Sequence, residues 1–406
     1  MIIDSKKYNG KCTCGKTHTM KTRFSVIESG CLKNASDYLK DLGISGVTVA
    51  VYDENTYKAT ADRHVKADCE IILNPDNLHA NEHGVDLLKK QLPENAEVLV
   101  AVGSGTIHDI VRYCAYENGC DFVSCPTAAS VDGFCSSVAA MTWHGCKKTL
   151  TAVAPRLVIA DIDIIKNAPV RLAKSGFGDM VGKFVALTDW KIGNILLNEF
   201  YCDTIADMTL EATRKVIDSA KGILTGDKTA YENLIYGLLL SGLAMQMMGN
   251  SRPASGAEHH ISHMIEMLEM SDALHGEKVG VGTLLAIAEY KRLSALDKTD
   301  FKDYALFTEE QIASALGKDK LDDIIAENKN DSANAVTARL LQTKWDDICN
   351  ELVKLPDFTE LYAELGIKSK LSDIDVPEKT AKTLLDCSPM VRNRLTLMRL
   401  RKCICC

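Results

Sequence analysis

The strongest constraint on the fold is an apolar, strand-like run that passes through a glycine turn into a helical pattern. Residues 98–103 read VLVAVG, an unbroken apolar run typical of strands that are buried on both faces. A helical pattern follows from about residue 110. Further strand candidates lie at 46–56, 69–75, 122–127 and 157–165. Strands that alternate with helices predict an α/β fold with a parallel sheet.

The turn after this run reads GSGTIHD and is a candidate phosphate site. Gly103 and Gly105 would let backbone N–H groups approach a nucleotide phosphate, and the positive end of the next helix would add to the attraction. His108 stands where the third glycine of the full GxGxxG dinucleotide pattern belongs. Taken alone, the turn is equally consistent with a nucleotide site and with a tight turn that binds nothing.

Polar residues follow two other strand candidates at positions that suit a cofactor. Asp53 lies at the end of VTVAVYDENT, and a polar residue after such a strand often binds a nucleotide ribose. After FVSCPT comes AASVDGFCSS, in which Thr127, Ser130 and Ser136 offer donors and Asp132 offers an acceptor. A loop that is simply rich in turn-forming residues is the alternative.

The sequence changes character near residue 168. With 406 residues, the chain is long enough for two or three domains. Beyond Pro169 the patterns are helical, with few strand candidates. We therefore expect an α/β nucleotide-binding domain over residues 1–168 and an all-α domain that binds metal and substrate over residues 169–406.

Four of the ten histidines lie within residues 251–282, SRPASGAEHHISHMIEMLEMSDALHGEKVGVG. Apolar residues recur there at helical spacing, so His259 and His263, four residues apart, share one face of a helix. His275 opens the next apolar run, and these imidazoles can meet around one metal ion. Asp179, an acid among glycines in GFGDMVGK, could complete the site. Ordinary polar residues on a helix surface are the alternative.

Two cysteine-rich segments near the ends of the chain could bind a soft metal. Cys12, Cys14 and His18 stand in KCTCGKTH, and the sequence ends in CICC. Neither segment has the paired two-residue spacing of a zinc ribbon. Thiols without a metal at mobile termini are therefore the alternative.

The overall composition excludes several classes of partner. A net charge of -8 and a pI of about 5.7 argue against a nucleic-acid or anionic-membrane surface. The longest apolar stretch, 234–248, is interrupted by Ser241 and Gln246, so we expect a buried helix and no membrane span. Fifteen cysteines scattered through apolar runs, with no secretory leader, predict a cytoplasmic protein.

Taken together, these motifs resemble the sn-glycerol-1-phosphate dehydrogenases, within the superfamily of iron-containing alcohol dehydrogenases, glycerol dehydrogenase and dehydroquinate synthase. The resemblance rests on the strand ending at Asp53 and on GSGTIHD, PTAASVDGF, GFGDMVGK, SRPASGAEHHISH, LHGEKVGVGT and SPMVRNRLTLMRL. SRPASGAEH together with PTAASVDG favours the glycerol-phosphate branch over glycerol dehydrogenase. Dehydroquinate synthases have a glutamate where Asp179 stands, which counts against their chemistry. The fold that the resemblance implies is dehydroquinate synthase-like.

The resemblance also implies roles for individual residues. One divalent metal per subunit, usually zinc in the family, with nickel or iron as alternatives, would be bound by Asp179, His259 and His275. Asp132, Asp179 and His263 would contact the substrate, with Asp179 and His263 acting in catalysis. The NAD(P)H contacts would come from Asp53, Gly103, Gly105, Thr106, Ile107, His108, Asp109, Thr127, Ala128, Ala129, Ser130 and Ser136.

The activity implied is the reversible reduction of dihydroxyacetone phosphate by NAD(P)H to sn-glycerol 1-phosphate, for glycerophospholipid or glycerol ether lipid synthesis. The substrate phosphate would need a cation, and Lys183, Arg252 and Lys278 are the candidates nearest in the sequence. We also expect a homo-oligomer. The alternatives are a related metal-dependent polyol dehydrogenase with another substrate, and a non-catalytic metal- or nucleotide-sensing protein of the same fold.

Overall fold

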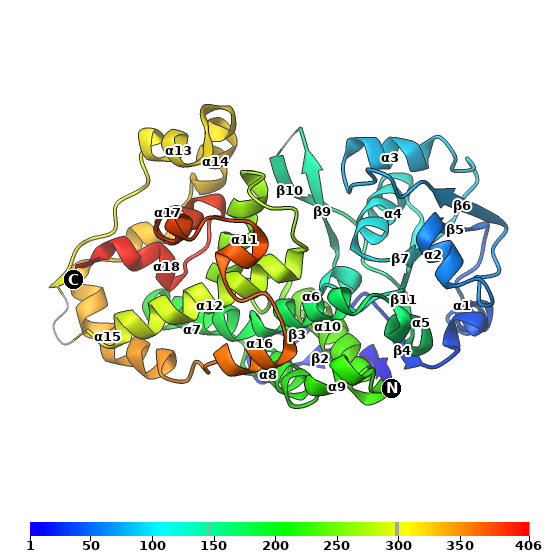
Figure 1. Cartoon of the computed structure of the whole chain (residues 1–406), viewed down its shortest axis with the longest axis horizontal. Helices are drawn as coiled ribbons and strands as arrows, with labels where there is room; N and C mark the ends of the chain where they lie inside the picture. Colours follow the sequence, from blue (N-terminus) through cyan, green and yellow to red (C-terminus); the bar gives the residue numbers. More distant parts are fainter. Residues whose placement is uncertain (145, 297–299, 406) are drawn as a thin grey trace. The chain divides into compact units, whose positions relative to one another are not determined.

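The computed structural model describes residues 1–144, 146–296 and 300–405 (Figure 1). These residues form two compact units. The first unit comprises Met1–Met180 and Glu211–Asn250, and the second comprises Val181–Leu210 and Ser251–Cys406. The last cysteine of the CICC tail, Cys406, lies outside the described residues.

The first unit is built on a seven-stranded sheet in the order β1-β4-β11-β8-β7-β5-β6. All neighbouring strands are parallel except β1, which runs antiparallel to β4, so the predicted parallel α/β sheet is confirmed. The strands are β1 Ile2–Asp4, β4 Phe24–Glu28, β5 Thr48–Asp53, β6 Cys69–Leu73, β7 Val98–Gly103, β8 Asp121–Pro126 and β11 Leu157–Asp161. Two hairpins pair β2 Gly10–Lys11 with β3 Thr17–His18, and β9 Val138–Trp143 with β10 Cys146–Thr151.

Helices pack around this sheet and make up most of the second unit. Those of the first unit are α1 Ala35–Asp41, α2 Glu54–Ala59, α3 Glu82–Lys89, α4 Gly105–Asn118, α5 Ile162–Asn167, α9 Lys221–Thr225 and α10 Lys228–Met248. Two of the three unit boundaries fall within α6 Val170–Val181 and α8 Asp203–Asp218, and the third lies between α10 and α11 (Ala257–Met267). Those of the second unit are α7 Lys183–Leu197, α11 Ala257–Met267, α12 His275–Ser294, α13 Glu309–Leu316, α14 Leu321–Asn328, α15 Ala338–Leu352, α16 Thr359–Leu365, α17 Ala381–Cys387 and α18 Leu397–Leu400.

The central strands are buried on both faces. In β7, Val98, Leu99, Val100, Ala101 and Val102 are all 0% exposed. Alternate residues of this strand enter different apolar clusters, one with residues of α3 and α4 and the other with residues of α1 and α5. Successive side chains of a strand point to opposite faces, so a strand covered on both sides must be apolar throughout. This burial explains the unbroken VLVAVG run.

The carboxyl ends of β5 and β7 form a switch point in the sheet. The two strands are neighbours, but the chain continues from β5 to β6 on one side and from β7 to β8 on the other. Ligands of open parallel sheets bind beyond the strand ends at such a point. Asp53 is the last residue of β5, and Gly103 is the last residue of β7. The sheet therefore brings the ribose candidate and the glycine turn to the same edge.

Several boundaries differ from the sequence expectations. Helix α4 begins at Gly105, well before residue 110, so GTIHD forms its first turns. The strand expected over 157–165 ends at Asp161, because the Asp161 side chain accepts a hydrogen bond from the Asp163 N–H and caps α5. The C-terminal part, expected to be all-α, also has a short ladder of β12 Asp300–Phe301 with β13 Ile404–Cys405.

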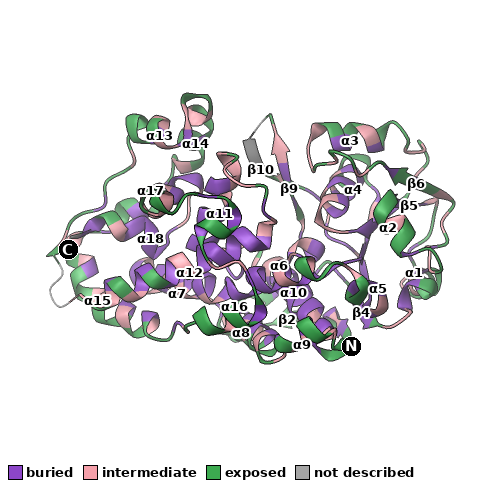
Figure 2. Ribbon diagram, in the orientation of Figure 1, coloured by how far each residue is buried: buried purple, intermediate pink, exposed green. Residues whose placement is uncertain are grey.

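The predicted domain boundary at residue 168 stays a prediction. The predicted boundary marks the change from strands to helices. The first compact unit instead continues to Met180 and also includes residues 211–250. The apolar stretch 234–248 lies in α10, which is largely buried, as is α11 (Figure 2). Among the described residues, no helix has both the length and the apolarity that crossing a membrane requires.

Helix α6 approaches the loop after β8 so closely that it requires a glycine. A Cβ on Gly176 would lie 2.1 Å from the Ala129 carbonyl oxygen, whereas a Cβ on Gly133 would meet nothing within 4 Å. Gly176→Ala should therefore lower the free energy of unfolding by about 1–3 kcal/mol, and Gly133→Ala should change it by less than about 0.5 kcal/mol. Urea titration measures both. Equal stabilities would contradict this close approach.

Candidate functional site

The glycine turn between β7 and α4 presents backbone donors at the edge of the sheet. The N–H groups of Gly105, Thr106 and Ile107 lie in the first turn of α4, where a helix offers them no intrahelical acceptors. Helix α4 is 14 residues long, so its positive end can attract a phosphate. A Cβ on Gly105 would meet Val131 at 3.5 Å and no closer atom. The turn therefore has the donors and the open space that a phosphate site needs.

His108 is part of the scaffold of this turn. Its Nδ1 lies 2.9 Å from the Ser104 carbonyl oxygen, and its Nε2 lies 2.8 Å from Ser124 Oγ. A carbonyl oxygen only accepts, so Nδ1 carries the proton and Nε2 accepts from the serine. Burial, and then the charge of Arg112, lowers the pKa of His108 to about 3, so the ring is neutral. Both ring nitrogens of His108 are therefore hydrogen-bonded within the protein. The expected contact of His108 with the cofactor stays a prediction.

Arg112 joins α4 to the segment that follows β8, and the sequence did not indicate it. Its buried guanidinium donates to the carbonyl oxygens of Phe134 at 3.1 Å and Val138 at 3.0 Å. It also pairs with Asp109, another expected cofactor contact, at 3.7 Å. The arginine therefore holds the loop against the helix that carries the phosphate candidates. A lone arginine in an amphipathic helix gives no signal of distant carbonyl partners.

The loop after β8 is buried and bonded to the glycine turn. The expected cofactor contacts on it are all buried, namely Thr127, Ala128, Ala129, Ser130 and Ser136. The Thr127 N–H donates to the Gly103 carbonyl oxygen at 3.0 Å. The Ser136 hydroxyl donates to the Val138 carbonyl oxygen at 2.9 Å, so it is engaged within the loop. Turn and loop thus form one continuous edge of the first unit.

Asp53 caps the helix that follows β5. Its Oδ1 accepts from the Thr56 N–H at 2.8 Å, and the Thr56 hydroxyl oxygen accepts from the Asp53 N–H at 3.0 Å. These reciprocal bonds form a capping box. A carboxylate has several further acceptor sites, so capping is compatible with binding a ribose. The ribose contact stays a prediction.

Asp132 and Asp179 lie together in the first unit. The Asp132 N–H donates to Asp179 Oδ2 at 3.0 Å, and the Ser241 hydroxyl of α10 donates to Asp132 Oδ2 at 2.8 Å. Asp179 is 0% exposed. A buried carboxylate is costly unless it is hydrogen-bonded or binds a cation, and here a backbone donor also fixes its orientation. Ser241, which only interrupted an apolar run in the sequence, therefore helps to position this pair.

Three histidines converge in the second unit. His259 and His263 lie on α11, and His275 is the first residue of α12, as their spacing predicted. The ring centroid of His259 lies 5.9 Å from that of His263 and 5.4 Å from that of His275, and the last two are 6.0 Å apart. Ligand atoms of His263, Glu266 and His275 lie within 4.8 Å of one another, as do those of His259 and His275. This cluster offers several imidazole donors to one ion.

Asp189 on α7 holds the helices that carry these histidines, and the sequence gave no sign of it. Its Oδ2 accepts from the Ala257 N–H at the start of α11 at 2.9 Å. Its Oδ1 accepts from the Tyr290 hydroxyl of α12 at 2.7 Å and from the Leu397 N–H of α18 at 2.9 Å. Burial raises the pKa of Asp189 to about 7. One buried carboxyl group therefore fixes three helices relative to one another.

Two carboxylates orient two of the histidines. His259 Nδ1 lies 2.7 Å from Glu258 Oε1, and His275 Nδ1 lies 3.1 Å from Glu266 Oε1. Glu258 Oε1 also accepts from the Gly256 N–H, and Glu266 is ionised, so in each pair the carboxyl oxygen accepts, Nδ1 donates and Nε2 keeps its lone pair. Metal-binding histidines commonly have such a carboxylate partner. Burial raises the pKa of Glu258 to about 7, and a cation on the His259 ring would favour its ionised form.

Glu266 forms an ion pair with a lysine in addition to its hydrogen bond with His275. Lys278 Nζ lies 3.3 Å from Glu266 Oε1. Burial alone would raise the pKa of Glu266, but the hydrogen bond and charge of His275 and the charge of Lys278 hold it well below its usual value. Glu266 is therefore ionised in the folded protein at neutral pH.

The three cations expected to bind a phosphate are already engaged within the second unit. Lys183 donates to a main-chain carbonyl oxygen at 3.1 Å. Arg252 pairs with Glu199, and Lys278 pairs with Glu266. The structure therefore does not favour any of them over other cations near the histidines.

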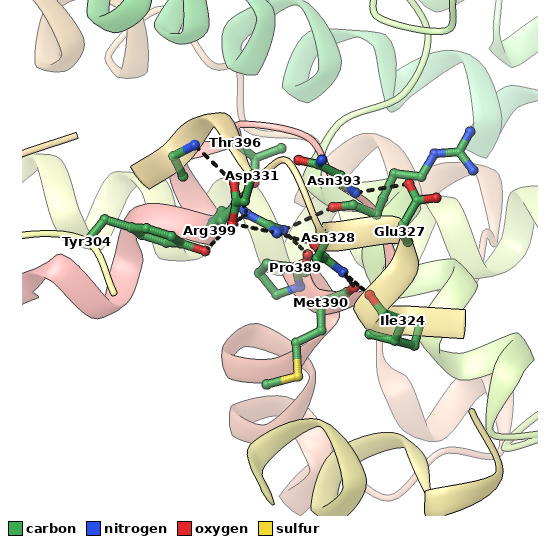
Figure 3. Close-up of polar contacts among 12 residues, drawn as sticks. Tyr304, Ile324, Glu327, Asn328, Asp331, Pro389, Met390, Asn393, Thr396 and Arg399 are labelled. Atoms are coloured by element: carbon green, nitrogen blue, oxygen red, sulfur yellow. Dashed lines mark hydrogen bonds and ion pairs between the residues drawn. The ribbon is translucent and has the colours of Figure 1, made fainter. Parts of the chain in front are cut away.

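The segment 388–400 brings another arginine, Arg392, toward the histidine cluster. Its first part, the 3-10 helix η8 (Ser388–Val391), packs against α11. Figure 3 shows the network that fixes this segment, in which the fully buried Arg399 pairs with Asp331 at 2.9 Å. Arg399 also donates to the Arg392 carbonyl oxygen at 3.0 Å. The main chain at Arg392 is therefore held by an arginine that forms a buried ion pair.

His263 is neutral in this setting. Burial is the largest cause that lowers its pKa well below the usual value, and any positive charge on His259, His275 or Arg392 lowers it further. Glu266 opposes this shift only in part. A neutral imidazole has one N–H donor and one acceptor, so His263 can exchange hydrogen bonds with a ligand.

The buried His108 should make stability depend on pH. Its pKa in the folded protein is about 3, below the unfolded value of about 6.5, so the unfolded chain binds the proton first as the pH falls. This site should therefore remove about 1.4 kcal/mol of stability per pH unit below about pH 6.5. In His108→Asn, which keeps a donor for the Ser104 carbonyl, the loss between pH 6.5 and 5 should be smaller by about 2 kcal/mol. Denaturant titrations at both pH values test this, and an unchanged pH dependence would contradict it.

Known proteins resemble this chain in sequence and in fold. Residues 26–169 match the family described as iron-containing alcohol dehydrogenase. The glycerol-1-phosphate dehydrogenase (NAD(P)+) of Bacillus licheniformis is 36% identical over 310 residues, 72% of this chain and 77% of the relative. The protein of the same name from Pyrococcus horikoshii is 34% identical over 265 residues, 64% of this chain and 76% of the relative.

Solved structures confirm the expected α/β and helical architecture. A probable glycerol dehydrogenase from Sinorhizobium meliloti superposes with a TM-score of 0.60 at 19% identity, over 90% of this chain and 88% of that one. At this identity the likeness shows the fold alone, which is the dehydroquinate synthase-like fold expected from the resemblance. The sequence relatives show the family, and the chain belongs to the glycerol-1-phosphate dehydrogenases.

Proposed function

We propose that this protein catalyses the reversible reduction of dihydroxyacetone phosphate by NAD(P)H to sn-glycerol 1-phosphate. The observation that carries the proposal is the pairing of His259 and His275 with carboxylates in a member of this family. The product would enter glycerophospholipid or glycerol ether lipid synthesis. The cytoplasmic location and the homo-oligomer expected from the sequence stay predictions.

Asp179, His259 and His275 are the proposed ligands of one divalent metal ion. The donor set fits such an ion, because both histidines turn Nδ1 to a carboxylate and leave Nε2 for the metal. Asp179 adds a buried carboxylate that the Asp132 N–H orients. Two nitrogens and one carboxylate oxygen suit zinc, nickel or iron, and of these we propose zinc. The ion would polarise the substrate carbonyl.

The first unit is the proposed site of NAD(P)H, which would supply the hydride. Its pyrophosphate would bind the first turn of α4, where Gly105, Thr106 and Ile107 present N–H groups. Asp53 at the end of β5 would bind the ribose. The buried loop beginning at Thr127 would limit the access of water to the cofactor. The switch point of the sheet supports this assignment, because ligands of parallel sheets bind at such a point.

His263 and Asp132 are the proposed substrate contacts. Reduction adds a proton to the carbonyl oxygen, and the neutral His263 ring can hydrogen-bond that oxygen and relay a proton to it. Asp132 Oδ2 already accepts from Ser241, which fixes the carboxylate so that it can accept from a substrate hydroxyl. Both side chains would thus orient the substrate for hydride transfer.

Arg392 is the proposed partner of the substrate phosphate. Its charge lies near enough to His263 to lower the pKa of that ring, after burial and the nearer histidines. An arginine can bind a phosphate with two parallel N–H donors. The buried pair of Arg399 and Asp331 fixes the main chain of its segment before substrate arrives.

The proposal is tested by NADH oxidation with dihydroxyacetone phosphate in the presence of zinc, nickel or iron. We expect rapid oxidation with the phosphorylated ketone and much slower oxidation with dihydroxyacetone. Equal rates with both would favour a polyol dehydrogenase. No oxidation with any cofactor and metal would favour a binding or sensing protein.

Loss of a proposed metal ligand should have a different effect from loss of His263. Asp179→Ala, His259→Ala and His275→Ala should each lose one metal equivalent and abolish turnover. His263→Ala should keep the metal and lower kcat by about 10²–10⁴-fold, the usual loss for a group that transfers a proton. Elemental analysis and steady-state kinetics measure both effects. Loss of the metal in His263→Ala would show instead that His263 is a ligand.

Arg392→Met should weaken binding of the phosphorylated substrate selectively. A charge-assisted hydrogen bond contributes about 1.5–3 kcal/mol, so the KM for dihydroxyacetone phosphate should rise by about 10–100-fold. The KM for NADH should stay the same. Arg339→Met on α15 removes an exposed arginine and serves as the matched control. If both variants kept the normal KM, the phosphate would bind elsewhere.

A further inference from the structure

The segment containing Cys12, Cys14 and His18 is an ordered hairpin. Strands β2 and β3 pair antiparallel, with Gly10 opposite His18. Between them, the Cys12 N–H donates to the Lys16 carbonyl oxygen at 2.8 Å, and the Gly15 N–H donates to the Cys12 carbonyl oxygen at 3.0 Å. Gly15 has a φ of +86°, a left-handed conformation that favours glycine. This tight turn brings the two cysteines and the histidine to one end of the hairpin.

The three side chains hold their donor atoms at distances that suit one metal ion. The ligand atoms of Cys12, Cys14 and His18 lie within 4.8 Å of one another. Cys14 Sγ lies 3.2 Å from His18 Nε2. Sulfur and nitrogen ligands of a tetrahedral zinc, at about 2.3 and 2.1 Å from the ion, are about 3.6 Å apart. Small side-chain rotations would therefore seat an ion among these atoms.

His18 is held in the form that binds a metal. Its Nδ1 lies 2.9 Å from the Met247 carbonyl oxygen, which only accepts, so Nδ1 carries the proton. The lone pair is therefore on Nε2, the nitrogen that faces Cys14. Metal-binding histidines are commonly oriented by such a backbone carbonyl. His18 is 3% exposed, which shields the ligand bond from water.

The chain after the hairpin is attached to the C-terminal part of α10. The N–H groups of Lys21 and Thr22 donate to Gln246 Oε1 at 2.8 and 3.2 Å. Gln246 Nε2 donates to Thr22 Oγ1 at 2.8 Å and to the Cys135 carbonyl oxygen. The same helix carries Ser241, which positions Asp132. An ion in the hairpin would thus reinforce a helix that supports the proposed substrate site.

We propose that Cys12, Cys14 and His18 bind a structural zinc ion, separate from the proposed catalytic metal. Two thiolates and one imidazole form a soft donor set that selects zinc over calcium or magnesium. A water molecule or a further side chain would complete the four ligands. The proposed catalytic set contains nitrogen and oxygen donors alone, so sulfur ligation distinguishes the two ions.

Cobalt substitution tests this proposal, because thiolate ligands give cobalt(II) an ultraviolet charge-transfer absorption that nitrogen and oxygen ligands do not. The wild-type protein loaded with cobalt should show this absorption, and Cys14→Ser and His18→Ala should lose it together with one metal equivalent. Cys69→Ser and His83→Ala, which remove a cysteine and a histidine from another part of the first unit, should retain both.

Zinc-edge X-ray absorption of the wild-type protein gives a second readout that does not depend on a variant folding. With both proposed sites filled, it should show sulfur at about 2.3 Å together with nitrogen, at an average of about one sulfur per zinc ion. Wild-type protein that binds cobalt and zinc without any sulfur ligand would overturn the proposal. So would a Cys14→Ser variant with the metal content and the absorption of the wild type.

Discussion

The histidine rings of the second unit lie so close together that no more than one of them can carry a positive charge, and the other features of the cluster depend on this. The rings of His259, His263 and His275 have centroids 5.4 to 6.0 Å apart, and protonating more than one of them in this partly buried place would bring like charges together. Neutral rings keep their lone pairs, and Glu258 and Glu266 determine that Nε2 carries them in two of the three. The cluster therefore favours a cation.

The rest of the fold positions two kinds of candidate site, one for a dinucleotide and one for a metal ion. In the first unit, the switch point of the parallel sheet presents the start of α4 and the end of β5, a combination that suits a dinucleotide. In the second unit, buried polar groups hold the histidine helices, with Asp189 joining α7, α11, α12 and α18. Each unit thus uses buried, satisfied polar groups to place the side chains that would bind cofactor and metal.

Local sequence patterns predicted the strands and helices whose formation depends on residues close together in the chain. The unbroken VLVAVG run gave β7 with its exact bounds, and the spacing of His259 and His263 gave one helix face. Features that depend on distant partners could not be predicted, such as the bonds of Asp189 or the carbonyl partners of Arg112. His108 was expected to touch the cofactor because of its place in a motif, but a motif does not reveal that its ring bonds to Ser124 on β8.

The central claim is that Asp179, His259 and His275 bind one metal ion, and anomalous diffraction from crystals of the zinc-loaded protein tests it most directly. The claim predicts one zinc peak about 2.0–2.2 Å from a carboxylate oxygen of Asp179 and from Nε2 of both histidines. A peak bound by His263, Glu266 and His275, with Asp179 not among its ligands, would contradict it.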